Sequence, residues 1–216
     1  MNARVKICCI SSQEEAATAV RHGVSAIGLV GRMPSGPGVI SDDMIREIAG
    51  AVPPGVSAFL LTSETTARGI IDHQKRTNTP VLQIVDYVKH EVLAEVKRTL
   101  PAVKIVQVIH VTGDDDVKLA AEYSAVADAL LLDSGNPYAD VKVLGGTGKT
   151  HNWDLSRKIV SEVRVPVFLA GGLSPLNVKE AVDYVKPYGV DICSGLRTNG
   201  MLDSTKVAEF FRNING

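Results

Sequence analysis

The chain has 216 residues, 45% of them apolar, and a formal net charge of −1. This length suffices for one large domain or two small ones with a substantial core, and the near-zero charge favours neither nucleic acid nor a membrane surface as partner. Residues 1–4 show no signal-peptide pattern, and no apolar stretch approaches the roughly 20 residues of a membrane span. Three scattered cysteines, Cys8, Cys9 and Cys193, argue against a disulfide framework. We therefore expect a cytoplasmic protein.

Short apolar runs alternate with segments of helical pattern along the whole chain. The runs predict strands at 5–10, 25–30, 56–61, 80–85, 103–111, 129–133, 166–170 and 190–193. A helix is predicted after each, at about 11–22, 41–51, 62–77, 90–100, 114–124 and 154–163, from 174, and at 204–213. Such units, with no break in composition, predict one α/β domain over residues 1–216, a (β/α)8 TIM barrel. A doubly wound open sheet is the alternative. In the barrel, function lies at the C-terminal ends of the strands.

Two strands bring reactive groups to that end of the barrel. The run of leucines at 130–132 ends in Asp133, a carboxylate that is either hydrogen-bonded to a neighbouring loop or catalytic, because burying it unpaired would be costly. The first strand brings Cys8 and Cys9. Since successive strand residues point to opposite faces, we expect only one of these thiols to face the barrel interior and the other to pack under the helices. A buried cysteine is ordinarily a small hydrophobe, so a structural role is the competing interpretation.

Glycine-containing turns follow the last three strands. Gly171 and Gly172 follow the seventh strand, Ser194 and Gly195 follow the eighth, and a glycine cluster at 145–148 follows the sixth. A single Gly-Gly is commonly just a tight turn, but barrels often bind phosphate between the loops after strands seven and eight. The sequence therefore predicts a phosphorylated small molecule as ligand. No histidine spacing resembles a metal site.

These residues resemble the phosphoribosylanthranilate isomerase family of tryptophan biosynthesis. The resemblance covers nearly the whole chain and is carried by Lys-Ile-Cys at 6–8, Leu-Asp at 132–133, Gly-Gly-Thr-Gly at 145–148, Trp-Asp at 153–154, Leu-Ala-Gly-Gly-Leu-Ser-Pro at 169–175, Asn-Val at 177–178, Gly-Val-Asp at 189–191 and Ser-Gly at 194–195. Each piece alone is modest, but together and in order they are specific.

The resemblance implies an Amadori rearrangement of an aminoaldose phosphate to an aminoketose, with no metal or redox cofactor. It implies that Asp133 is the general acid, which protonates the furanose ring oxygen so that the ring opens to a Schiff base. Cys8 would be the general base that removes the C2′ proton to give an enolamine. A base thiol has to be at least partly thiolate, and Lys6, two residues away on the same strand face, is a candidate for the positive charge this needs.

The sequence departs from the family mainly where the aglycone would bind. The family usually has glycine after the catalytic cysteine, where this chain has Cys9. A Ser-Pro-Arg run usually follows strand two and its arginine holds the anthranilate carboxylate, but this chain has Gly38 at that place. After strand four, Gln-Leu-His-Gly is replaced by Gln-Ile-Val-Asp at 83–86, and after strand eight, Ser-Gly-Val-Glu is replaced by Ser-Gly-Leu-Arg at 194–197.

Two arginines could supply the missing carboxylate contact. Arg32 and Arg197 are the candidates, because guanidinium pairs bidentately with carboxylates; the alternative is that both are solvated. Gln83 and Gly146 complete the expected substrate contacts, and Gly171, Gly172, Ser194 and Gly195 are expected to hold the phosphate.

The expected function is therefore isomerisation of phosphoribosylanthranilate. The alternatives are a family relative that isomerises a different N-linked ribose phosphate and a non-catalytic phosphate-binding paralogue. The expected partner is a small phosphorylated substrate, without nucleic acid or membrane, and the oligomeric state stays open.

Overall fold

The structure is a computed structural model that describes residues 3–34, 36–135 and 151–216. Its strands are β1 (Arg4–Ile7), β2 (Ala26–Val30), β3 (Ser57–Thr62), β4 (Val81–Ile84), β5 (Lys104–His110), β6 (Ala129–Asp133), β7 (Val167–Leu169) and β8 (Gly189–Ile192). Its main helices are α1 (Gln13–Arg21), α2 (Asp42–Ala51), α3 (Ala67–Thr77), α4 (His90–Thr99), α5 (Asp115–Ser124), α6 (Trp153–Glu162), α7 (Val178–Val185) and α8 (Ser204–Asn215).

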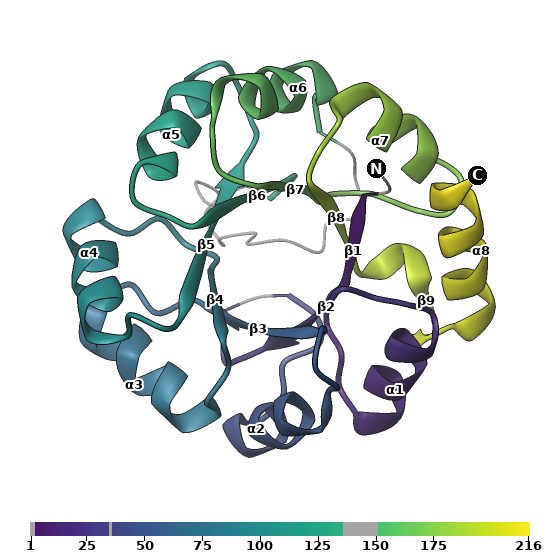
Figure 1. The fold of residues 1–216 in the computed structure, drawn as a ribbon, viewed down its shortest axis with the longest axis horizontal. Coiled ribbons are helices and arrows are strands. Elements are labelled where there is room, and N and C mark those ends of the chain that lie inside the picture. Colours follow the sequence, from purple (N-terminus) through teal and green to yellow (C-terminus); the bar gives the residue numbers. More distant parts are fainter. Residues whose placement is uncertain (1–2, 35, 136–150) are drawn as a thin grey trace.

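The strands form a closed parallel barrel inside a ring of helices (Figure 1). Each strand pairs with its neighbour in sequence, and β8 closes on β1 with Val5 opposite Val190 and Lys6 opposite Asp191. Closure confirms the predicted (β/α)8 TIM barrel and excludes the open doubly wound sheet. Among the described helices, none is long and apolar enough to cross a membrane.

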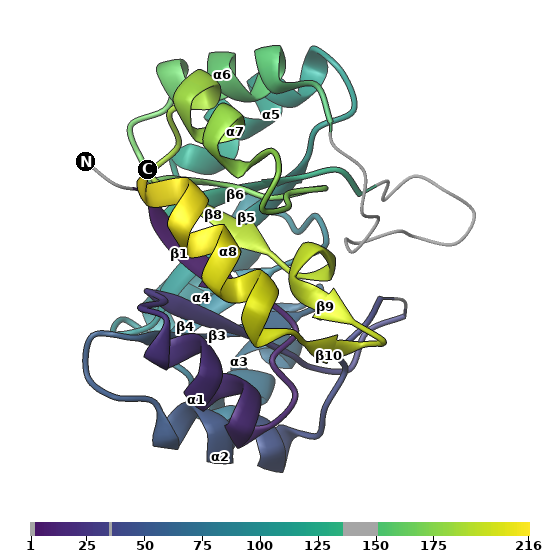
Figure 2. The same ribbon diagram turned by 90° about the vertical axis from the view of Figure 1, so that its right-hand side faces the viewer.

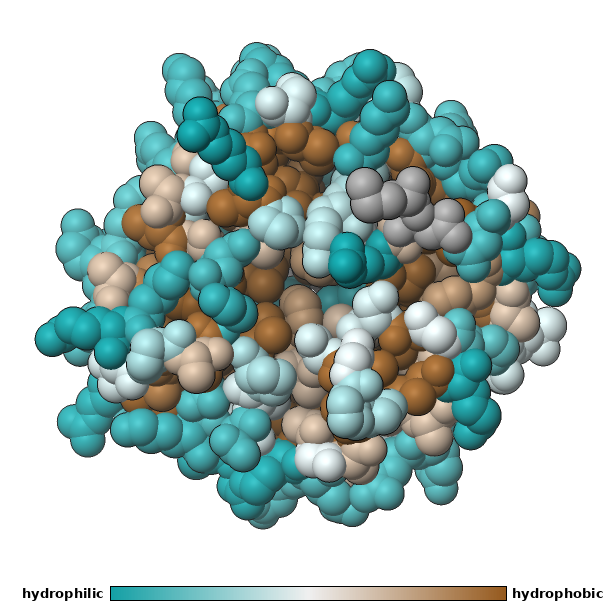
Figure 3. All heavy atoms as spheres, in the orientation of Figure 1, coloured by the Kyte–Doolittle hydropathy of each residue, from teal (hydrophilic) through white to brown (hydrophobic). Residues whose placement is uncertain are grey.

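The core has two layers, which explains why the strands are nearly continuous apolar runs. On β6, Leu130 and Leu132 pack outward against the helices, whereas Ala129 and Leu131 fill the barrel interior. A strand that is buried on both faces needs apolar residues at every position. Hydrophilic residues gather at the periphery of the face seen in Figure 3, and hydrophobic ones lie closer to its centre. The alternation along β6 turns Asp133 inward, to the same side as Leu131.

Side chains cap several of the helices, and α3 begins later than predicted. The Ser41 hydroxyl accepts a hydrogen bond from the Met44 amide at 3.2 Å and so caps α2, close to the predicted start of that helix. The third helix was expected from residue 62, but β3 continues through Thr62 and α3 begins at Ala67. The hydroxyl of Thr66 accepts a hydrogen bond from the Gly69 amide and makes Thr66 the cap.

The seventh helix also starts later than predicted, at Val178 rather than near residue 174. The Asn177 side chain accepts a hydrogen bond from the Ser174 amide at 2.8 Å and donates one to the Gly172 carbonyl at 3.0 Å. These two bonds fold residues 172–177 into a turn, which fixes the loop that follows β7.

An unpredicted hairpin follows β8. A short 3-10 helix, η1 (Ser194–Leu196), leads into β9 (Arg197–Thr198) and β10 (Met201–Leu202). Asn199 and Gly200 form the turn with φ angles of 53° and 82°, the positive values that two-residue hairpins favour. In the side view of Figure 2 this hairpin lies at the end of the molecule opposite the two termini, so it stands at the barrel mouth.

Candidate active site

A pocket opens at the C-terminal ends of the strands, with a volume of about 730 Å³ measured out to its mouth. Of the residues predicted from sequence, its lining includes Cys8, Gln83, Asp133, Gly171, Gly172 and Ser194. Arg32, Gly195 and Arg197 are not among the lining residues, and Gly146 lies outside the described residues, as does the whole cluster at 145–148.

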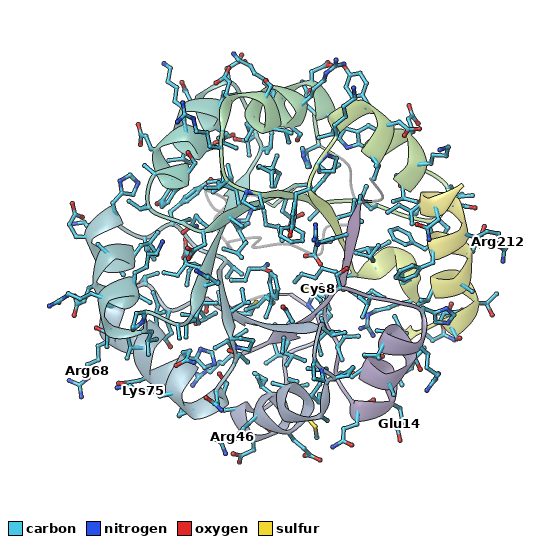
Figure 4. The ribbon with its side chains drawn as sticks, in the orientation of Figure 1. Cys8, Glu14, Arg46, Arg68, Lys75 and Arg212 are labelled. Atoms are coloured by element: carbon cyan, nitrogen blue, oxygen red, sulfur yellow. The ribbon has the colours of Figure 1, made fainter. Side chains whose placement is uncertain are left out.

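Both thiols at the end of β1 face this pocket. Cys8 and Cys9 are each only 6% exposed, and both belong to the lining. The prediction that one of them would pack under the helices is wrong. The reason is a φ of 60° at Cys9, a left-handed conformation that interrupts the alternation of strand side chains. Figure 4 shows Cys8 beside the end of β1, toward the barrel centre.

A buried ion pair lies next to Cys8. Lys6 is fully buried, and its Nζ is 2.9 Å from a carboxylate oxygen of Asp191. Burial alone would lower the pKa of Lys6, but Asp191 and the nearby Cys8 more than reverse this, so its pKa is raised and it stays an ammonium. A β-carbon at Gly28 would lie 2.9 Å from the Lys6 Nζ and 2.8 Å from the Cys8 Sγ. The missing side chain at Gly28 is thus what lets the ammonium and the thiol approach each other.

Asp133, the last residue of β6, lines the pocket with a carboxyl group whose pKa is raised. Its Oδ1 accepts a hydrogen bond from the Ser134 amide at 2.7 Å, and β5 places His110 directly opposite. Burial raises the pKa of Asp133, although the Ser134 amide and His110 act in the other direction. Asp133 therefore keeps its proton at higher pH than an ordinary aspartic acid does, as a general acid requires.

The loops after β7 and β8 contain glycines at positions that a side chain would not easily occupy. Gly171 and Gly172 have φ angles of 78° and 64°, which favour glycine. A β-carbon at Gly195 would lie 2.2 Å from the carbonyl oxygen of Leu173, so only glycine fits there. Bare backbone at the start of η1, beside Ser194, provides the close approach that an anion site needs.

Gln83 presents a polar atom to the pocket from β4. Its side chain is 3% exposed, and its Oε1 has no hydrogen-bond partner among the described residues. A buried acceptor without a partner is costly, and a ligand hydroxyl would remove that cost.

The two candidate arginines have different surroundings. Arg32 is exposed, just beyond β2. Arg197 is instead engaged inside the protein: one guanidinium nitrogen lies 2.8 Å from Glu15, and the other donates to Glu15 at 3.2 Å and to the carbonyls of Cys9 and Cys8. Burial would raise the pKa of Glu15, but Arg197 and the backbone amides of Leu202 and Ser11 hold it below its ordinary value.

Arg197 thus acts as a clamp on the backbone that carries Cys8. We expect Arg197→Met to lower the free energy of unfolding by about 3–5 kcal/mol, because Glu15 would be left buried without its cation. Chemical denaturation measures this change. The kcat should fall more than KM rises, with partial recovery in Arg197→Lys. Arg68→Met is the matched control, since Arg68 lies on the outer surface with only an exposed contact to Asp72; a similar stability loss there would contradict the clamp.

Besides the apolar and backbone lining, the predicted site left out three reactive or charged pocket residues, Cys9, Cys193 and Asp191. A readable signal existed for one of them. Lys6 and Asp191 are charged residues inside otherwise apolar strands. In a closed barrel these two strands, β1 and β8, are neighbours, so the two residues could have been predicted as an ion pair. For the two thiols the strand pattern carries no such signal.

Comparison with known proteins agrees with this geometry. The family model described as N-(5′-phosphoribosyl)anthranilate (PRA) isomerase matches residues 5–213. The chain is 38% identical over 209 residues to N-(5′-phosphoribosyl)anthranilate isomerase 2 of Methanosarcina mazei, covering 96% of this chain and 92% of that one. It is 34% identical over 212 residues to the Methanocella arvoryzae isomerase, covering 98% and 97%.

A similar solved structure carries a ligand. It is a phosphoribosyl anthranilate isomerase in complex with reduced 1-(o-carboxyphenylamino)-1-deoxyribulose 5-phosphate; it has a TM-score of 0.81 and 25% identity, covering 99% of this chain and 98% of that one. The family match spans nearly the whole barrel, including the strands that carry Cys8 and Asp133. The chain therefore belongs to the N-(5′-phosphoribosyl)anthranilate isomerase family.

Proposed function

We propose that the chain catalyses the Amadori rearrangement of N-(5-phosphoribosyl)anthranilate to the 1-deoxyribulose 5-phosphate aminoketose. The observation that carries the proposal is the position of Cys8 and Asp133 in one pocket, beside Gly171 and Gly172 of the loop after β7 and Ser194 of the loop after β8. A site that only binds phosphate would need neither the thiol nor the carboxyl group. As an enzyme of amino-acid biosynthesis, the protein is expected in the cytoplasm.

The reaction needs one proton donor and one proton acceptor. Asp133 donates its proton to the furanose ring oxygen, the bond from that oxygen to C1′ breaks, and the nitrogen lone pair forms the Schiff base. The Cys8 thiolate then removes the C2′ proton, and the electrons of that C–H bond form the C1′–C2′ double bond of the enolamine. Tautomerisation then moves the proton of the C2′ hydroxyl to C1′ and leaves the ketone at C2′.

The ion pair of Lys6 and Asp191 lies next to the proposed base. Lys6 is a permanent ammonium close to the Cys8 sulfur, in a buried site where charges interact strongly. Asp191 holds the Lys6 side chain in place through the 2.9 Å contact. Lys6 is therefore a positioning and electrostatic residue rather than a proton carrier.

Loop amides hold the phosphate, and the opposite wall takes the aglycone. The loops of residues 171–172 and 194–195 provide the amides, and Gln83 accepts a hydrogen bond from a ribose hydroxyl. The aryl ring lies against the apolar wall of Val30, Met33 and Leu61. Since the Nη atoms of Arg197 already bind Glu15 and backbone carbonyls, Arg32 is the better candidate for the anthranilate carboxylate. Gly146 remains a proposed substrate contact.

The test is turnover of phosphoribosylanthranilate by the purified full-length chain, followed through the loss of substrate fluorescence. We expect multiple turnovers without added metal. Binding of substrate without turnover would support the phosphate-binding paralogue. Failure to bind this substrate, with turnover of a phosphoribosylamine that carries a different substituent, would support the relative with another aglycone. An unchanged KM in both Arg32→Ala and Arg197→Ala would exclude both arginines from the carboxylate contact.

A further inference from the structure

Three free thiols from two neighbouring strands meet at the mouth of the pocket. Cys8 and Cys9 follow β1, Cys193 follows β8, and all three line the same cavity. The two strands are hydrogen-bonded partners up to this point, with the Cys8 amide donating to the Ile192 carbonyl at 2.8 Å. No described group of three His, Cys, Asp or Glu side chains could hold a metal ion, so a metal centre does not explain the cluster.

The conformation of Cys9 turns its thiol toward this cluster. With a φ of 60°, Cys9 adopts a backbone conformation that glycine adopts far more easily. Its side chain packs over Gly38, where a β-carbon would lie 2.6 Å from the Cys9 Cβ and 3.3 Å from its Sγ. The Cys9 thiol lies within hydrogen-bonding reach of the thiols of both Cys193 and Cys8. A cysteine is thus kept at an unfavourable φ, with its sulfur beside a second sulfur.

The thiols of Cys9 and Cys193 differ in pKa and in exposure. The hydrogen bond with Cys9 lowers the pKa of Cys193, and the nearby guanidinium of Arg197 lowers it further. The same hydrogen bond raises the pKa of Cys9. Cys193 is partly exposed, whereas Cys9 is buried. A partly exposed thiol of lowered pKa next to a buried thiol of raised pKa is the arrangement of an oxidisable cysteine with its resolving partner.

We propose that Cys9 and Cys193 form an oxidisable thiol pair, which hydroperoxides convert to a disulfide across the mouth of the pocket. The Cys193 thiolate attacks a peroxide oxygen, the O–O bond breaks, hydroxide leaves and Cys193 becomes a sulfenic acid. The Cys9 sulfur then attacks the Cys193 sulfur, the S–O bond breaks, and the hydroxyl leaves as water with the Cys9 proton. Two thiols lose two electrons, and one hydrogen peroxide is reduced to water and hydroxide.

The disulfide would tie together two loops of the site. The loop after β1 carries Cys8, and the loop after β8 carries Ser194. Their cross-link changes the space between the base and the phosphate cradle, so we expect oxidation to reduce turnover reversibly.

The experiment treats the full-length protein with hydrogen peroxide, then maps disulfides by mass spectrometry and titrates free thiols. We expect a loss of two of the three thiols, a cross-link between the peptides of Cys9 and Cys193, and full recovery with dithiothreitol. Because the readout is covalent, it is independent of whether the chain turns over phosphoribosylanthranilate.

Two variants make the result decisive. Cys9→Gly relieves the positive φ and removes the resolving thiol, so peroxide should take Cys193 to a sulfinic acid that dithiothreitol does not restore. Cys8→Ser should still form the cross-link. A Cys8–Cys9 link, or sulfinic acid at Cys193 of the unmodified chain without any cross-link, would overturn the proposal.

Discussion

Asp133→Asn should lower kcat by about 10²- to 10⁴-fold, the usual contribution of a general acid. Asparagine keeps the shape of the side chain and can still accept the hydrogen bond from Ser134, but it has no proton to give to a ring oxygen. KM should therefore change much less than kcat. Steady-state kinetics with phosphoribosylanthranilate measures both, and a reduction of less than tenfold would remove Asp133 from the acid role.

The pH profile gives an independent check on the same residue. Asp133 works protonated, and burial raises its pKa, so turnover should be lost as the pH rises through a value above the ordinary range of aspartic acid. This alkaline loss should be absent from the residual activity of Asp133→Asn. Asp86→Asn is the matched control, because Asp86 is a buried carboxylate beyond the end of β4 that does not line the pocket. Its profile should keep the alkaline loss.

The barrel and the inward position of Asp133 could be predicted because both depend on local pattern. Eight apolar runs, each followed by a helical segment, leave a closed parallel sheet as the simplest arrangement. Along 129–133, the alternation of strand faces then fixes which side chains point inward. This reasoning needs no knowledge of distant contacts, which is why it succeeds for Leu130, Leu131 and Asp133.

The same reasoning fails where a single backbone angle or a distant partner decides. At Cys9, a positive φ places the thiol in the pocket instead of under the helices. No neighbouring residue in the sequence indicates this conformation. Arg197 and Glu15 are 182 residues apart, so their ion pair was invisible without the barrel. The Asn199–Gly200 dipeptide was a readable hairpin signal. It was missed because each flanking strand is only two residues long.

The two departures from the family at positions 9 and 38 are physically linked. A β-carbon at position 38 would overlap the Cys9 Cβ, and Gly38 itself has a φ of 79°. An arginine at 38 is therefore incompatible with Cys9 in its present conformation. The family combination of glycine after the catalytic cysteine and arginine after strand two avoids this overlap, so the two sites are expected to change together.

Cys8→Ala should likewise lower kcat by about 10²- to 10⁴-fold, because no other group is proposed to remove the C2′ proton. Cys8→Ser should be little better, since a serine hydroxyl stays protonated at neutral pH. Cys9→Gly, which replaces the adjacent thiol by the residue usual in the family, should reduce kcat far less. If Cys9→Gly and Cys8→Ala lost comparable activity, the assignment of Cys8 as the base would be wrong.

The placement of the Lys6 ammonium next to the Cys8 thiol can be tested without replacing either residue. Gly28→Ala adds a methyl group within 3 Å of both the Cys8 Sγ and the Lys6 Nζ, so both side chains have to move. Because displacements of about 1 Å in a catalytic site can cost about 10²-fold, kcat should fall by about that much while substrate binding stays nearly intact. An unchanged kcat would mean that the placement of Lys6 next to Cys8 does not contribute to turnover.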